Sequence, residues 1–149
     1  MNIDDQIEQI FSNVLTEIIS IVSGFYLEVQ SQDRDNSFDD ITAVMSLCGK
    51  ENILIFISAK EKDIRILCSF ITGIPQEEVT KADMEDTLCE LVNMTAGSAK
   101  LRLGGAEFTL SPPFSISGSD MSIAVKNKTQ IVSKVLGNHE ISVKLKVVH

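Results

Sequence analysis

The chain has 149 residues, of which 44% are hydrophobic and 23% charged, with a formal net charge of −8 and a pI near 4.7. This size and balance indicate one soluble globular domain, residues 1–149, with a substantial core. The acidic balance excludes the basic surface that nucleic acid or an anionic membrane would require.

The N-terminus is acidic where a signal peptide would be basic, and no apolar run approaches the roughly 20 residues of a membrane span. The cysteines Cys48, Cys68 and Cys89 are odd in number and form no Cys-x-x-Cys pair, as is typical of reduced thiols. We therefore expect a cytoplasmic protein. The only histidines are His139 and His149, which excludes a zinc site and histidine-assisted nucleophilic catalysis.

The first third of the chain predicts a helix followed by three strands. Apolar residues recur every three or four positions over residues 2–23, and residues 25–31 alternate as a short strand. The polar segment 32–39 carries three aspartates but lacks the glycine and terminal glutamate of a calcium loop, so we interpret it as a solvated turn. Strands follow at 41–48 and 52–58. The second of these is continuously apolar and should be a buried central strand.

A second helical pattern begins at Ser58 and stops at Gly73. Thr80 and Asp83 then form a candidate capping box for a long central helix that continues to Leu103.

The C-terminal third is expected to be mostly strand. A short strand at 107–110 is interrupted by two prolines, and a serine-glycine loop at 115–120 leads to a strand at 121–125. A hairpin follows, with strands 130–136 and 141–147 flanking a tight Gly-Asn turn. Its second strand alternates apolar residues with Ser142, Lys144 and Lys146, which should face water.

This order predicts an α+β fold. An antiparallel or mixed sheet should carry the N-terminal helix and the long central helix packed on one face.

The central helix has two different sides at about 100° per residue. Its core-facing stripe comprises Leu88, Leu91, Val92, Thr95 and Ala99. The opposite side carries Asp86, Glu90, Asn93, Gly97 and Lys100. Glu90 and Asn93 are neighbours there, and a glycine such as Gly97 costs a helix about 1 kcal/mol relative to alanine. Spacing alone leaves two interpretations: a solvated face with an incidental glycine, or a surface that another protein approaches.

The motif Glu-Leu-Val-Asn-Met-Thr-Ala-Gly-Ser-Ala-Lys, residues 90–100, resembles the CheX branch of the CheC/CheX chemotaxis phosphatases. The resemblance covers nearly the whole chain, including residues 40–44 at the second strand and Ser117-Gly118 near a late strand. This chain contains one Glu-x-x-Asn helix, as CheX does, whereas CheC-type members carry two. One departure follows Gly49, where the family often has a second glycine and this chain has Lys-Glu-Asn.

The resemblance implies a phosphatase that removes the phosphoryl group from the aspartate of a CheY-like receiver domain. Asn93 would then orient the attacking water and Glu90 would form an ion pair with the receiver. Asp86, Gly97 and Lys100 are expected to contact the same partner. The chain would need no cofactor of its own because the receiver supplies Mg²⁺. The resemblance also implies a homodimer paired through sheet edges, with the C-terminal hairpin leaving an edge that needs cover.

Two other functions remain open at this point. The chain could be a non-catalytic module that binds receiver domains, or a structural relative of the middle domains of flagellar switch proteins.

Overall fold

A computed structural model describes residues 3–32, 36–104, 107–126 and 130–149. The helices are α1 (Ile3–Ser23), α2 (Glu61–Thr72), the short 3₁₀ helix η1 (Gln76–Glu78) and α3 (Lys81–Arg102). The strands are β1 (Glu28–Gln32), β2 (Ile41–Cys48), β3 (Ile53–Ala59), β4 (Thr109–Leu110), β5 (Phe114–Ser117), β6 (Ile131–Gly137) and β7 (Ser142–Val148).

The seven strands form one sheet in which six follow the order β1-β6-β7-β3-β2-β4 and the seventh, β5, also pairs with β2. Every pairing is antiparallel. The predicted α+β fold is confirmed, with the antiparallel alternative realised. The apolar strand β3 lies between β2 and β7, so the prediction of a buried central strand is also confirmed. Strands β4 and β5 lie end to end along the outer side of β2, pairing with its residues 47–48 and 41–44.

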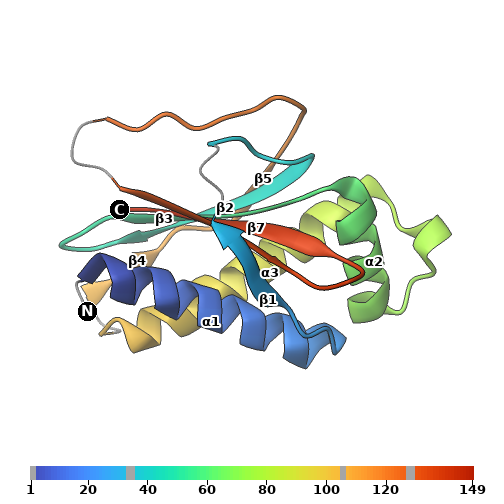
Figure 1. The fold of residues 1–149 in the computed structure, drawn as a ribbon, viewed down its shortest axis with the longest axis horizontal. Coiled ribbons are helices and arrows are strands. Elements are labelled where there is room, and N and C mark those ends of the chain that lie inside the picture. The colour runs from blue at the N-terminus through green and yellow to red at the C-terminus, as the bar shows by residue number, and fades with distance from the viewer. Residues whose placement is uncertain (1–2, 33–35, 105–106, 127–129) are drawn as a thin grey trace.

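The helices α1 and α3 cover one face of the sheet, and α2 lies at one end of it (Figure 1). Helix α1 buries one side, because its apolar residues recur at helical spacing. The buried side comprises Ile7, Phe11, Val14, Leu15, Ile18 and Ile19. The helix α3 buries the whole predicted stripe from Leu88 to Ala99. No helix in the described ranges is both long and apolar enough to cross a membrane.

Loops cover part of the opposite face of the sheet, which corrects the expectation that Lys146 faces water. A small cluster of Val44, Phe56 and Val148 lies there under Phe38 and Ile123. Lys146 is fully buried beside this cluster, where its Nζ donates a hydrogen bond of 2.7 Å to Ser133 Oγ. Alternation correctly identified the two faces of β7, but it could not show that loops cover the second one.

The segment after the two prolines also differs from the prediction. The expected loop at 115–120 contains the end of strand β5, whose residues pair with β2. The expected strand at 121–125 makes only an isolated bridge between Ser37 and Ser122, with hydrogen bonds from Phe38 N to Met121 O and from Ile123 N to Asn36 O. The serines indicated a loop, whereas the available side of β2 provides the backbone partners that make this segment a strand.

Three boundaries also differ from the prediction: those of the hairpin turn, the first strand and the second helix. Gly137 pairs with Ser142, so the turn lies at residues 138–141, where Asn138 Oδ1 accepts hydrogen bonds from Glu140 N and Ile141 N. The first strand starts at Glu28 because the preceding Phe25 and Leu27 are buried in the core rather than paired in the ladder. Helix α2 starts at Glu61, since Ser58 and Ala59 still belong to β3.

We predict that Leu91→Ala lowers the free energy of unfolding by about 2–4 kcal/mol. Leu91 is 1% exposed in the core between α3 and the sheet, so truncation leaves a cavity. Chemical denaturation measures the change. Leu101→Ala is the control on the same helix: that leucine is 77% exposed, and its loss should change stability by less than about 0.5 kcal/mol. Equal effects of the two variants would contradict the assigned orientation of α3.

Candidate functional site

Helix α3 is held at both ends by its own polar groups. The predicted capping box is present: Thr80 Oγ1 accepts from Asp83 N at 3.1 Å, and Asp83 Oδ2 accepts from Thr80 N at 2.9 Å. Hydrogen bonds from the Thr80 backbone, and then from its hydroxyl, hold the pKa of Asp83 below its ordinary value. At the other end Arg102 Nη2 lies 2.6 Å from Glu17 Oε2 of α1. The helix is therefore a fixed platform for the residues on its outer side.

Glu90 and Asn93 lie on that outer side and are both exposed. They are three residues apart, which separates them by about 60° around the helix axis and about 4.5 Å along it. Neither side chain has a hydrogen-bond or ion-pair partner within the described part of the chain. The arrangement presents one carboxylate and one neutral amide, side by side and available to a partner.

Gly97 follows Asn93 by one turn and lies between Glu90 and Asn93 in angle around the helix. A Cβ atom built on it would meet no atom within 4 Å outside the helix's own backbone. Packing within the described chain therefore does not require glycine here.

The other two predicted contact residues flank this surface. Asp86 is exposed one turn before Glu90, and Lys100 is partly buried beyond Gly97. The structure thus brings all five predicted site residues to one side of a single helix.

Cys89 borders the same surface but is unsuited to act as a nucleophile. Burial, followed by the nearby carboxylates of Asp86 and Glu85, raises the pKa of its thiol, and a hydrogen bond with Ser115 opposes this only in part. A raised pKa keeps the group a thiol at neutral pH, whereas the thiolate is the reactive form. The carboxylate of Glu90 and the amide of Asn93 are among the exposed polar groups that this face offers to a partner.

Sequence reasoning missed a groove that lies beside Glu90. It is an open groove of about 370 Å³, bounded by the C-terminal ends of α1 and α2 and by α3 between Asp83 and Met94. Its lining residues are Val22, Ile71, Thr72, Asp83, Asp86, Thr87, Glu90, Leu91 and Met94. Periodicity marks Val22 and Ile71 as the last apolar residues of their helices, but it cannot show that these helix ends meet.

The described residues include no group of three His, Cys, Asp or Glu side chains placed to hold a metal ion. The aspartate-rich segment 32–39 is only partly covered by this statement, because residues 33–35 lie outside the described ranges.

A sequence model of the family described as chemotaxis phosphatase CheX matches residues 41–136. The chain belongs to the CheX family. The match spans β2 through β6 and therefore includes the whole of α3 with Glu90 and Asn93. No curated protein sequence matches the chain.

Solved structures share the CheX fold over nearly the full length. A CheC-like superfamily protein from Shewanella sp. PV-4 has a TM-score of 0.82 at 22% identity, covering 99% of this chain and 98% of that one. The chemotaxis protein CheX from Vibrio vulnificus has a TM-score of 0.82 at 17% identity, covering 95% and 97%. A CheX from Borrelia burgdorferi, solved in complex with CheY, BeF₃ and Mg²⁺, has a TM-score of 0.78 at 17% identity, covering 95% and 96%. At these identities the likeness establishes the fold.

We predict that Gly97→Ala raises the free energy of unfolding by about 0.5–1 kcal/mol. Alanine is the better helix former, and its Cβ would meet open space. Urea denaturation measures the change. A destabilised Gly97→Ala variant would show that packing inside this chain selects the glycine.

Proposed function

We propose that this CheX-family chain hydrolyses the aspartyl phosphate of a CheY-like receiver domain. The observation that carries the proposal is the pair Glu90 and Asn93, exposed on the outer side of a rigid helix. Family membership supports it, as does the Borrelia CheX that was solved with CheY, BeF₃ and Mg²⁺. A receiver partner also favours a cytoplasmic location.

In this proposal Asn93 orients the attacking water. Hydrolysis of an acyl phosphate requires a water held in line with the bond that breaks, and an amide offers both an acceptor and donors without titrating. Asn93 lies in the middle of the 22-residue helix α3, away from its ends, so its backbone is well fixed. Asn93 lowers the activation barrier for hydrolysis because it holds the water in the attacking position before the reaction begins.

Glu90 forms an ion pair with a lysine of the receiver. Its carboxylate has no competing cation in the described part of the chain, so a partner's ammonium group can take it directly. Because the lysine carries its charge before and during the reaction, Glu90 serves mainly to bind the receiver and to fix its orientation on α3.

The surrounding residues make room for the receiver and contact it. Gly97 leaves the helix backbone bare next to Asn93, so the rim of the receiver's site can come close. A Gly97→Ala variant that is more stable yet binds the receiver less tightly would separate this role from a structural one. Asp86 and Lys100 are the flanking contacts. The receiver supplies the Mg²⁺ that neutralises charge on the phosphoryl group.

The deciding experiment measures release of inorganic phosphate from phosphorylated CheY-like receivers with Mg²⁺, with and without the purified chain. Accelerated release supports the proposal. Binding without accelerated release would identify the chain as a non-catalytic receiver-binding module. If the chain neither binds the receiver nor accelerates phosphate release, a structural role remains, as in the flagellar switch middle domains.

Asn93→Ala should lower the maximal rate of phosphate release by a factor of roughly 10²–10³, by analogy with the loss of one preorganised hydrogen-bonding group. Asn93 is exposed and off the core, so the free energy of unfolding should change by less than about 0.5 kcal/mol. Saturation curves and a denaturation curve check both parts. A variant with a full maximal rate and a raised half-saturation concentration would make Asn93 a docking residue instead.

Glu90→Gln should raise the half-saturation concentration of the receiver as well as slow turnover, because it removes a charge while keeping the shape. Added salt should reproduce part of the loss in the wild-type protein and have less effect on the variant. Saturation curves at two ionic strengths provide the measurement. The ion pair is refuted if wild type and variant depend on salt in the same way.

We also propose that the chain forms a homodimer. The reason first offered for an edge contact was wrong, because the C-terminal hairpin is paired on both sides, β6 with β1 and β7 with β3. The outer strands of the described sheet are instead β1 on one side and β4 with β5 on the other, and one of these edges would have to form the contact. Light scattering at micromolar concentration is expected to give twice the monomer mass, and a monomer there would rule the dimer out.

A further inference from the structure

The groove beside Glu90 is continuous with the proposed site. Around α3, Glu90 lies about 60° from Asn93, and Met94 lies about 40° further on in the same direction. Glu90 and Met94 both line the groove, whereas Asn93 does not. A protein that covers Asn93 and Glu90 together therefore reaches the opening of the groove.

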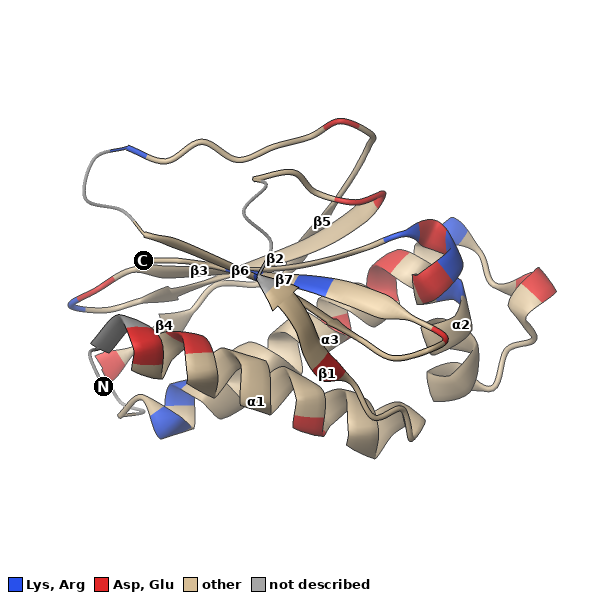
Figure 2. Ribbon diagram, viewed as in Figure 1, with Lys and Arg blue, Asp and Glu red and all other residues tan. Residues whose placement is uncertain are grey.

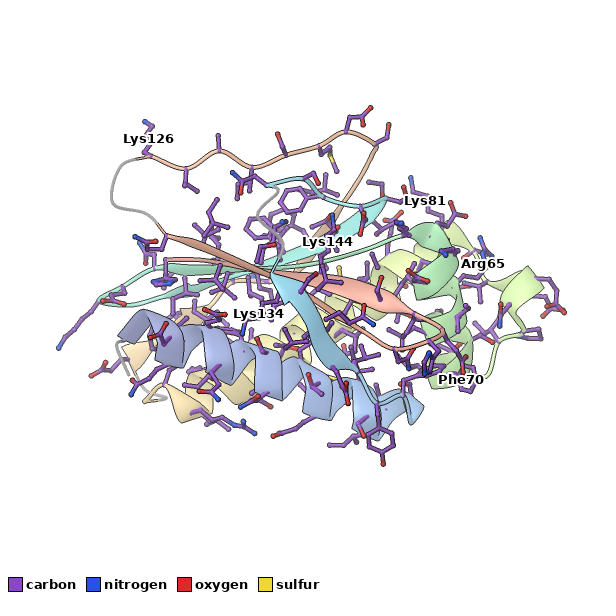
Figure 3. All side chains as sticks on the ribbon, in the orientation of Figure 1. Arg65, Phe70, Lys81, Lys126, Lys134 and Lys144 are labelled. Carbon is purple, nitrogen blue, oxygen red and sulfur yellow. The ribbon has the colours of Figure 1, made fainter. Side chains whose placement is uncertain are left out.

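The groove is negatively charged. Among the described residues that line it are three carboxylates, Asp83, Asp86 and Glu90, and no lysine or arginine. The helix α2 ends at Thr72 beside it with no basic residue in its last turn, and α1 ends next to Val22 in the same way. The carboxyl ends of helices carry partial negative charge, so both ends add to the field of the carboxylates. Figure 3 shows Arg65 and Lys81 lying away from the end of α2 that carries Phe70, and in Figure 2 the ribbon at that end of α2 has no Lys or Arg colouring.

The inner surface of the groove is apolar. Val22, Ile71, Leu91 and Met94 line it, one or two from each surrounding helix. Next to Ile71 on α2, the ring of Phe70 is 57% exposed and packs edge-on against Phe25 at a centroid distance of 4.6 Å. An apolar recess with an acidic rim is complementary to an apolar side chain flanked by lysine or arginine.

We propose that this groove receives an apolar side chain from a basic stretch of the receiver's surface, and that Asp86 and Met94 thereby select which receiver docks. The inference rests on the proposed function and identifies the chemistry of the partner. Asp86 contributes charge at the rim, and Met94 contributes a flexible apolar contact that adapts to the incoming side chain. Affinity depends on both, whereas the hydrolysis step depends on Asn93.

The test measures the dissociation constant of the CheY-like receiver that the wild-type protein dephosphorylates fastest, loaded with Mg²⁺ and beryllofluoride. Asp86→Asn removes one charge from the rim, and Met94→Gln keeps the length of the side chain but makes its end polar. The matched controls lie outside the groove and away from the outer side of α3. Glu77→Gln removes one exposed charge from η1, and Leu54→Gln makes the same kind of apolar-to-polar change on β3, where the leucine is 37% exposed on the opposite face of the sheet. Denaturation curves check that all four variants fold.

We expect the dissociation constant to rise about fivefold for Asp86→Asn and about tenfold for Met94→Gln. The controls should stay within about twofold of wild type. In turnover assays each groove variant should raise the half-saturation concentration more than it lowers the maximal rate. The affinity of Asp86→Asn should also depend less on salt than that of wild type.

Several outcomes would overturn the inference. If the groove variants bind the receiver as wild type does, while wild type still releases phosphate, the groove has no part in docking and the proposed function stands. If Asp86→Asn and Glu77→Gln weaken binding equally, net charge rather than the groove is responsible. If none of the CheY-like receivers that are tested binds the wild-type protein, the proposed function fails and this inference fails with it.

Discussion

The burial of one side of α3 is the constraint on which the rest of the structure depends. Leu88, Leu91, Val92 and Ala99 are at most 1% exposed, and Thr95 is fully buried with its hydroxyl bonded back to Leu91 O at 2.7 Å. This stripe packs against β2 and against α1 and α2. A helix that is fixed by one side in this way cannot rotate without exposing its apolar stripe, at a cost of about 25 cal/mol for each Å². The directions of Glu90 and Asn93 are therefore set by the residues on the core-facing side of the same helix.

The features that could be predicted from the sequence are those that depend on local spacing. The stripe on α3, its capping box and the buried strand β3 all follow from the identity of residues close together in the chain, and all three are present. The outer side of α3 could be predicted for the same reason, because it is the complement of the stripe. These local patterns fixed which residues are exposed together.

The features that were missed depend on which distant segments come together. Strand β5 has a serine-rich sequence typical of a loop and becomes a strand only because β2 offers it backbone partners. Lys146 follows the alternation of an exposed position and is buried because Phe38 and Ile123 lie over that face. The groove combines Val22, Ile71 and Met94 from three helices, and no window of the sequence contains more than one of them. In each case tertiary contacts override what the local pattern predicts.

The outer side of α3 contains groups that do little for the fold. The contrast with Glu85 on the same helix is informative: its carboxylate accepts a hydrogen bond from Ser115 Oγ at 3.1 Å and lies 3.9 Å from Lys81 Nζ. Glu90, five residues further on, has neither kind of partner in the described chain, and Gly97 weakens the helix without relieving any contact. An exposed carboxylate loses its water when a protein docks on it, so docking is favoured when the partner brings a cation or hydrogen-bond donors to that point. An amide carries no such charge and does not titrate. If Asn93 positions the water, the group that this chain brings to the water carries no charge, and its action does not change with pH.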